Sequence, residues 1–426
     1  MAAILSSVGA IILGMGIVQV GNGLLTTLLG LRMGIEGFPT EVVGLVMSGY
    51  FAGQMIGARL IPRIIERVGH IRTFAASAAL LAASGLGHVL LVFPVAWGVL
   101  RVITGTCMAG LIMTSESWTN ERATKATRGK ILAIYMITIY FAIALGQLLL
   151  NTGDPGGFEL FVLAGVLLTL GVLPVTLTRS VAPASEERSR LGIRELWAVT
   201  PLGLTGVAGA GLVNSSFYGM GPIFAQDIGL DVAGVSTFMG VTIFAGLLMQ
   251  WPVGWISDRF DRRTVLTGVF FGVTLASLAI IPAVAISPLA LFTFVALYGG
   301  LSFTVYSISI SHANDFIAPG DLVKATGSYV LIYGTGAVVG PFTASALMAW
   351  IGPEGLFVYA AAINLLLGSF ALYRMTRREA RPNEEQGAFV ALPTTSPVAQ
   401  TLDPRVDPED AAAPAPAEDE VPPSPA

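Results

Sequence analysis

The chain has 426 residues, of which 54% are hydrophobic and 12% are charged, and its mean hydropathy is +0.75. An ordinary soluble domain carries about 25% charged residues, so this composition excludes a water-soluble globular protein and indicates a membrane protein. The chain contains one cysteine and three histidines. These counts exclude a disulfide framework and a metal cluster of cysteines or histidines, and we expect neither a cofactor nor a metal.

The net charge of −4 is an average over two unlike parts of the chain. Residues 376–426 hold 10 acidic residues, 4 arginines and 10 of the 24 prolines, which leaves a small positive balance on residues 1–375. Because this tail has no apolar periodicity, we expect 376–426 to be a disordered, acidic, Pro-rich segment. The chain lacks the basic stripe that binds nucleic acid, so we expect no nucleic-acid partner.

Intervals without Asp, Glu, Lys or Arg predict the membrane crossings, because one helical crossing needs about 20 mostly apolar residues. The first interval has no basic n-region and is too long for a signal peptide, so we expect it to be retained as a helix. Another interval, 264–314, holds 51 residues, and Ser287-Pro288 divides it into two helices. The sequence thus predicts twelve helices, in the intervals 2–31, 42–58, 73–100 with its continuation to 115 (two helices), 131–153, 160–178, 196–226, 232–257, 264–314 (two helices), 325–353 and 355–373.

The basic residues predict the orientation of these helices. With both termini in the cytoplasm, all but two of the 23 Lys and Arg fall in cytoplasmic loops or in the tail, as the positive-inside rule requires. Arg32 falls outside, and Arg101 falls within the membrane. The reverse orientation would invert this distribution, so we expect both termini to be cytoplasmic.

The two halves of the chain resemble each other at offsets of 192 to 194 residues. Such self-similarity indicates duplicated structural units, and here it predicts a six-helix bundle at 1–178, a cytoplasmic linker at 179–197 and a second six-helix bundle at 198–375. Parallel repeats of this kind enclose a midplane cavity in many transporters. The matched positions include Asn22 with Asn214, Gly105 with Gly299, Ser115–Glu121 with Ser309–Asp315, Lys130 with Lys324, Tyr135 with Tyr329, and Gly146 with Gly340.

The loops after the second and eighth helices carry a recognisable motif. The later loop runs from Gly254 through Asp258-Arg259 to Arg262-Arg263, and the earlier loop keeps Glu66-Arg67, Gly69 and Arg72. With Tyr50–Gly53, Arg101–Gly105 and Ala144–Leu149, the chain resembles the major facilitator superfamily and its bacterial YcaD-type branch. The match is imperfect, since Asp261 replaces a Gly of the later loop, and Pro62 and Glu66 replace the Gly and Asp of the earlier one.

This resemblance implies an all-α integral membrane protein of the bacterial inner membrane, with twelve helices in two six-helix pseudo-repeats. It further implies a secondary transporter that moves a small solute through the lipid bilayer by alternating access, coupled to protons. We expect a monomer. The chain has no phosphate-binding Gly loop with Lys, which argues against direct drive by ATP, and no nucleophile or metal cluster that would indicate a membrane enzyme. Two alternatives stay open: an uncoupled facilitator, and a transporter-like sensor or scaffold that acts through its tail.

The two motif loops are candidates for a cytoplasmic gate. A tight reversal needs a residue such as Gly that tolerates positive φ, and a carboxylate next to the arginines can pair with them. Such a cluster could latch the two halves together in one state of the transport cycle. The alternative is that the basic residues only set topology. The candidates are Glu66, Arg67, Gly69, Arg72, Gly254, Asp258, Arg259, Arg262 and Arg263.

Two ionisable residues lie in the predicted fourth helix, where charge is costly and therefore informative. Arg101 and Glu116 are 15 residues apart, about 22 Å along a helix, so they cannot pair and must have different tasks. In the repeat they align with Val295 and Ile310, so the shared fold requires neither charge.

The resemblance implies a role for Arg101 in substrate or proton handling. Alternatively, Arg101 is structural and satisfies helix-end carbonyls or Gln19. Glu116 is the protonatable candidate for coupling, because burial raises the pKa of a carboxyl group. Alternatively, Glu116 forms a salt bridge with a basic loop residue such as Arg67, Arg72 or Arg128.

Amides and aromatic residues complete the expected cavity. The resemblance implies that helices 1, 4, 7 and 10 line it, although a buried amide can equally join two helices. The same two alternatives, lining the cavity or joining two helices, apply to Gln54 and Gln147. The predicted polar and aromatic candidates on the lining helices are Gln19, Asn22, Asn214, Tyr218, Tyr298, Ser302 and Tyr306.

Overall fold

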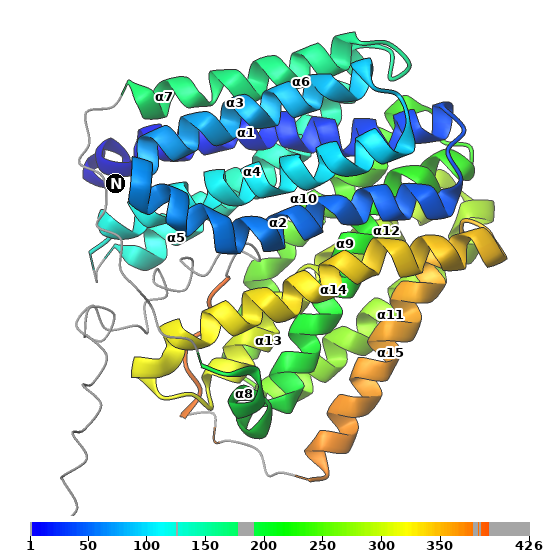
Figure 1. The fold of residues 1–426 in the computed structure, drawn as a ribbon. Helices are drawn as coiled ribbons and strands as arrows, with labels where there is room; N and C mark the ends of the chain where they lie inside the picture. Colours follow the sequence, from blue (N-terminus) through cyan, green and yellow to red (C-terminus); the bar gives the residue numbers. More distant parts are fainter. Residues whose placement is uncertain (1, 125–126, 178–190, 378–381, 383–384, 392–426) are drawn as a thin grey trace, which may run out of the picture.

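The structure is a computed structural model that describes residues 2–124, 127–177, 191–377, 382 and 385–391, with side chains described from residue 8 onward except at 319 and 323 (Figure 1). The secondary structure of these described parts is helical, without strands. The long helices are α1 (Ala2–Ile35), α2 (Thr40–Val68), α3 (His70–Leu90), α4 (Pro94–Glu121), α5 (Arg128–Leu148), α6 (Glu159–Leu170), α9 (Pro201–Asp227), α10 (Val232–Ser257), α11 (Arg262–Ile286), α12 (Pro288–Ser302), α13 (Val305–Asn314), α14 (Leu322–Ile351) and α15 (Gly355–Met375). Shorter helices are η1 (Leu149–Thr152), α7 (Val172–Thr176), α8 (Ile193–Val199) and η2 (Pro319–Asp321).

Ten helical segments in the described part of the chain are long and apolar enough to cross a membrane. The number rises to eleven if α8 and α9, which are bent by 119° relative to each other, form one span. The remaining predicted crossing is α2, which has Glu41 in its first turn and Arg67 in its last. All twelve predicted segments are therefore helices. Helices suit the bilayer because they satisfy their own backbone hydrogen bonds in lipid.

The predicted break at Ser287-Pro288 is confirmed. Ser287 has an extended backbone, and its hydroxyl accepts a hydrogen bond from the Ala290 N–H at 3.1 Å. Pro288 occupies the first helical position, where its missing N–H costs nothing. The tenth crossing then consists of α12 and α13, which are separated at Phe303–Thr304.

Glycines bring the helices of each half into close contact, and they do so at repeat-related positions. A methyl group at Gly105 on α4 would overlap the Tyr50 carbonyl oxygen of α2, and one at Gly299 on α12 would overlap the Thr242 carbonyl oxygen of α10. Gly146 of α5 approaches α1 in this way, as Gly340 of α14 approaches α9. Small residues are the usual means of close helix packing in lipid. The pseudo-repeat is therefore built into the packing of both halves.

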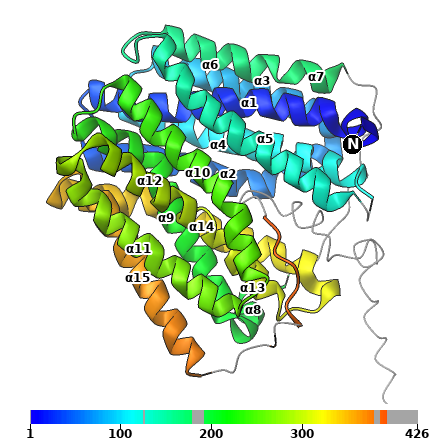
Figure 2. The ribbon, with the colours of Figure 1, turned by 180° about the vertical axis from the view of Figure 1, so that it is seen from behind.

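The two groups of helices, α1–α7 and α9–α15, meet at one end of the molecule and separate toward the other (Figures 1 and 2). α2 and α14 run side by side near the C-terminal ends of α1 and α9. Contacts at this end include the Asn151 amide, which donates to the Ser236 hydroxyl at 3.0 Å, and the approach of Gly34 to the Gln226 side chain. Under the predicted orientation this is the outer end.

Parts of the predicted linker and tail lie against the second half. The Ser328 hydroxyl donates to the Leu191 carbonyl at 2.5 Å, just before α8 begins. Residues 385–391 run beside α13 (Figure 2). Residues 178–190 and 392–426 lie outside the described residues, so the domain boundaries and the disorder of the remaining tail stay predictions.

The packing of α4 on α2 gives a first prediction. The substitution Gly105→Ala should lower stability by about 1–3 kcal/mol, because the added methyl group meets backbone rather than a flexible side chain. Gly98→Ala on the same helix is the matched control, since no atom lies within 4 Å of a methyl group there; it should change stability by less than about 1 kcal/mol. Thermal unfolding in detergent checks this, and equal melting temperatures for the two variants would contradict it.

Candidate solute cavity between the two bundles

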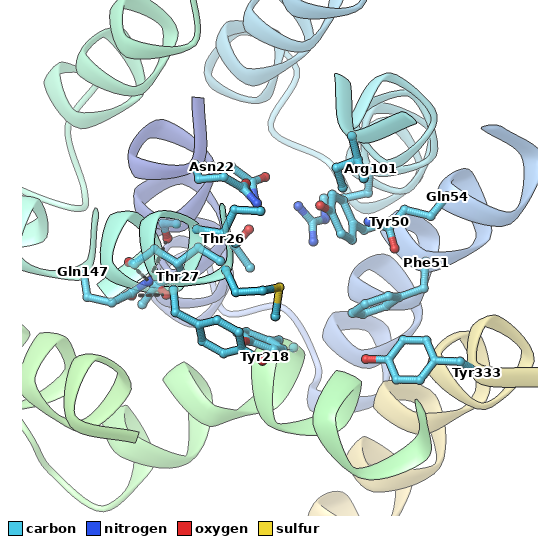
Figure 3. Close-up of a pocket in the computed structure, with 18 residues that line it drawn as sticks. Asn22, Thr26, Thr27, Tyr50, Phe51, Gln54, Arg101, Gln147, Tyr218 and Tyr333 are labelled. Atoms are coloured by element: carbon cyan, nitrogen blue, oxygen red, sulfur yellow. Dashed lines mark hydrogen bonds between the residues drawn. The ribbon is translucent and has the colours of Figure 1, made fainter. Parts of the chain in front are cut away.

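A cavity of about 140 Å³ lies between the two groups of helices. Residues from α1, α2, α4 and α5 line most of it, and α9 and α14 supply Tyr218, Gly219 and Tyr333. Figure 3 shows the labelled side chains around one shared space. The cavity therefore lies where movement of one bundle against the other would open or close it. Its lining consists of Gln19, Asn22, Gly23, Thr26, Thr27, Tyr50, Phe51, Gln54, Arg101, Ile112, Met136, Ile139, Tyr140, Ile143, Gln147, Tyr218, Gly219 and Tyr333.

Arg101 brings a positive charge to this lining. Its side chain lies about two turns into α4, is 1% exposed and points into the cavity (Figure 3). The guanidinium carbon lies 4.5 Å from the ring centroid of Tyr50, a cation–π contact. Among the described residues, Arg101 forms no ion pair, and its Nε has no hydrogen-bond partner.

The amides around Arg101 differ in how far the protein already satisfies them. The Asn22 amide donates to the Gln19 side-chain oxygen at 3.3 Å, and Gln54 lies beside Tyr50 on α2. Gln147 joins α5 to α1, because its amide donates to the Gly23 carbonyl at 3.2 Å and its oxygen accepts from the Thr27 hydroxyl at 2.6 Å. Asn22 bonds Gln19, and the Tyr50 hydroxyl bonds Asn22 and Gln54. Because a side-chain amide has two donors and two acceptor lone pairs, Gln19, Asn22 and Gln54 each have capacity left for a solute.

Four of the predicted cavity residues lie in the helix packing instead. The Asn214 side-chain oxygen accepts a buried hydrogen bond from the Ser302 hydroxyl at 2.9 Å, which joins α9 to α12. Tyr298 packs edge-on against Phe357 at 5.2 Å. Tyr306 packs edge-on against Tyr333 at 5.2 Å, behind the lining. The structure therefore assigns Asn214, Tyr298 and Ser302 to the packing of the second half, and Tyr306 to support of a lining residue.

The cavity also contains residues that the sequence analysis did not select. Tyr50, Phe51, Tyr140 and Tyr333 come from the second, fifth and eleventh crossings, whereas the resemblance directed attention to helices 1, 4, 7 and 10. The tenth crossing contributes nothing to the described lining. A sequence signal for Tyr50 did exist, because an aromatic ring near the middle of an apolar span is a natural partner for a buried guanidinium.

Glu116 lies outside the cavity on the same helix as Arg101. Its side chain is fully buried, and the Tyr135 hydroxyl of α5 lies beside its carboxyl group. Ile112, one turn earlier on α4, belongs to the cavity lining. One turn of helix is about 5.4 Å, so Glu116 is close to the cavity on the side toward the diverging ends of the bundles.

The motif loop of the second half forms a compact charge network. Arg262 is 1% exposed, and its guanidinium donates to Asp315 at 2.6 Å and to Asp258 at 3.3 Å. It also donates to the Ser257 hydroxyl at 3.0 Å and to the Gly387 carbonyl at 2.7 Å. Buried charged groups are tolerated when they are paired and hydrogen-bonded, and Arg262 satisfies this condition.

The other residues of this loop shape its ends. The Asp261 carboxylate caps α11 by accepting from the Arg263 N–H at 3.1 Å and pairs with the Arg263 side chain at 3.2 Å. The Arg259 guanidinium carbon lies 3.8 Å from the Trp255 ring centroid. Among the described residues of this loop no backbone has positive φ, so the expected need for Gly does not apply where Asp261 replaces it. Gly254 lies in α10 and makes room for the Phe389 ring.

The corresponding loop of the first half is built differently. Gly69 has φ 84° between α2 and α3, which is the conformation for which Gly is suited. Glu66, Arg67 and Arg72 are exposed, and in the described part of the chain no ion pair joins them. The two copies of the motif therefore differ, and only the second is closed by a charge network.

Comparison with known proteins finds one family and related transporters. The family model of the Major Facilitator Superfamily matches residues 11–322. The chain is 29% identical over 379 residues to the uncharacterized MFS-type transporter YcaD of Escherichia fergusonii, covering 88% of this chain and 97% of that protein. It is 30% identical over 357 residues to YcaD of Salmonella newport, covering 83% and 92%.

Solved structures with a similar fold are also transporters. The nucleoside transporter NupG has a TM-score of 0.70 at 15% identity, covering 87% of this chain and 99% of that one. A bacterial homologue of the human lysosomal transporter Spinster, in an inward-facing and occupied conformation, has a TM-score of 0.69 at 15% identity, covering 89% and 97%. With the family match over most of its length, the paired bundles and the cavity between them, this chain belongs to the Major Facilitator Superfamily and is a membrane transporter.

Proposed function

We propose that this protein is a secondary active transporter of the bacterial inner membrane that carries one small solute at a time through the cavity around Arg101, coupled to protons. The observation that carries this proposal is the position of the cavity, which is lined from both bundles and contains a buried charge. Rocking of two repeats about such a site is the physical basis of alternating access.

The arrangement of the bundles supports an inward-facing state. The helices meet at the ends where α1 and α9 finish, and they diverge toward the α2–α3 and α10–α11 junctions, beside which Arg67 and Arg259 lie (Figure 1). The positive-inside rule predicts that these basic junctions are cytoplasmic. The charge network of Asp258, Arg262 and Asp315 lies at this diverging end, where it can contribute to closing the cytoplasmic face.

Glu116 is the proposed coupling residue. It is the one acidic residue among the described parts of α3, α4 and α5 that is fully buried, and burial disfavours the charged form of a carboxyl group. It is one turn from the cavity-lining Ile112. A change in its protonation therefore acts next to the solute site without occupying it.

Uptake into proteoliposomes tests both transport and coupling. The vesicles are exposed to a defined mixture of organic acids, amino acids, nucleosides and sugars, and their contents are measured by mass spectrometry with and without a gradient of one pH unit. Such a gradient is worth about 1.4 kcal/mol per proton, so a solute coupled to one proton should accumulate up to about tenfold. Glu116→Gln should still equilibrate that solute but should lose the accumulation.

The matched control is Glu121→Gln, which changes an exposed carboxyl group at the end of the same helix and should behave as the unmodified protein. Accumulation by Glu116→Gln equal to that of the control would refute the coupling role. Equilibration without accumulation in the unmodified protein would identify an uncoupled facilitator. Uptake no faster than in protein-free vesicles would contradict the transport function itself.

A further inference from the structure

We propose that the solute of this transporter is a small organic anion, whose carboxylate binds the Arg101 guanidinium and whose apolar body lies against the aromatic side of the cavity. This inference rests on the proposed transport function, and it names the chemical class of the solute.

The described lining of the cavity carries a net positive charge. The Arg101 guanidinium is positively charged at neutral pH, and the other described residues of the lining are neutral. None of these lining residues is acidic. The charge on the cavity wall therefore has no counterpart on the wall itself, which leaves that place to an anionic ligand.

A buried cation without an ion-pair partner is energetically costly within a membrane. Arg101 is 1% exposed, its Nε has no hydrogen-bond partner, and Tyr50 supplies a cation–π contact at 4.5 Å. Buried ionisable groups within a membrane normally pair or mark a substrate path. A planar carboxylate matches the fork of guanidinium donors, and such charge-assisted pairs are among the strongest hydrogen bonds.

The rest of the lining has amide groups and aromatic rings. Asn22, Gln19 and Gln54 lie on the Arg101 side and can bond further polar atoms of the solute. Tyr218 and Tyr333 lie toward the opposite bundle, with Phe51 between (Figure 3). A volume of about 140 Å³ is below the roughly 300–1,000 Å³ of sites for drug-sized ligands. The cavity therefore suits a small monoanion with one polar end and one apolar end.

Ligand stabilisation of the purified protein tests the class directly, because a ligand that binds the native state raises the melting temperature. Benzoate, nicotinate, lactate and hexanoate are each compared with the primary amide of the same shape: benzamide, nicotinamide, lactamide and hexanamide. At least one carboxylate should raise the melting temperature in a saturable manner while its amide does not. Equal effects of acid and amide, or no effect of any carboxylate, would overturn the inference.

The variant Arg101→Gln separates binding from folding. It should weaken the affinity for the stabilising carboxylate by about ten- to hundredfold, the loss expected for a charge-assisted hydrogen bond. Its ligand-free melting temperature should be equal to or higher than that of the unmodified protein, because an unpaired buried charge has been removed. An unchanged carboxylate affinity in this variant would refute the inference. A carboxylate that binds through Arg101 but does not cross proteoliposomes would instead count against the transport function.

A second observation concerns the segment Gln386–Ala391, which follows α15 and lies on the charge network of the second half. The Gly387 N–H donates to Asp315 at 3.0 Å, and the Phe389 N–H donates to Asp258 at 2.7 Å. The Arg262 guanidinium donates to the Gly387 carbonyl at 2.7 Å. All three charged residues of the network are therefore engaged by the backbone of this segment.

Apolar contacts hold the same segment in place. Val390 is 7% exposed, and the Phe389 ring fills the space beside Gly254 on α10. From this geometry we infer that Gln386–Ala391 is an autoinhibitory strap, which occupies the gating loop of the second half and slows closure of the cytoplasmic face.

Two truncations test the strap in the otherwise complete protein. Removal of 386–426 should lower the melting temperature and increase the initial transport rate at least twofold. Removal of 392–426 is the matched control, which deletes most of the acidic tail but keeps the strap, and it should change neither quantity. The inference fails if the two truncated proteins behave alike, or if loss of the strap leaves both the melting temperature and the rate unchanged.

Discussion

The close approach of α2 and α4 is the constraint on which the site depends. Gly53 and Gly105 allow each backbone to reach the other, and the Thr106 hydroxyl adds a hydrogen bond to the Gly53 carbonyl at 3.0 Å. Lipid provides no hydrophobic drive for helix association, so such contacts carry much of the packing energy. The consequence is local and chemical, because this packing sets the Tyr50 ring 4.5 Å from the Arg101 guanidinium carbon.

The polar residues of the membrane segments then fall into three groups. One group joins helices, as Asn214 with Ser302 and Gln147 with Thr27 do. The second group, around Arg101, faces the cavity, and the Arg101 Nε has no hydrogen-bond partner among the described residues. The third is the buried carboxyl group of Glu116, one turn beyond the lining. Under the proposed function, solute binding and protonation take place at different positions on one helix.

The sequence alone predicted the twelve helices, the break at Ser287-Pro288 and the superfamily, because charge-free length and self-similarity are strong signals in a membrane protein. It also singled out Arg101, since a charge within an apolar span is rare. It could not predict that Asn22 lines the cavity whereas Asn214 joins two helices, because equivalent positions in a repeat can face different neighbours. Nor could it find Tyr333 or the strap. Tyr333 joins the lining because of how the two bundles meet, and the strap binds Asp258, Arg262 and Asp315 of its own bundle, far away in the sequence; no local pattern records either contact.

Alternating exposure of the cavity is the central claim, and thiol labelling tests it most directly. In a Cys107→Ser background, Asn22→Cys places one thiol in the cavity wall, and a membrane-impermeant reagent is applied from either side of oriented vesicles. We predict labelling from both sides, and loss of outside labelling alone when Gly34→Cys and Gln226→Cys are joined by a disulfide across the outer ends, where residues 34 and 226 lie in contact. Outside labelling that persists with the outer ends joined would contradict the account.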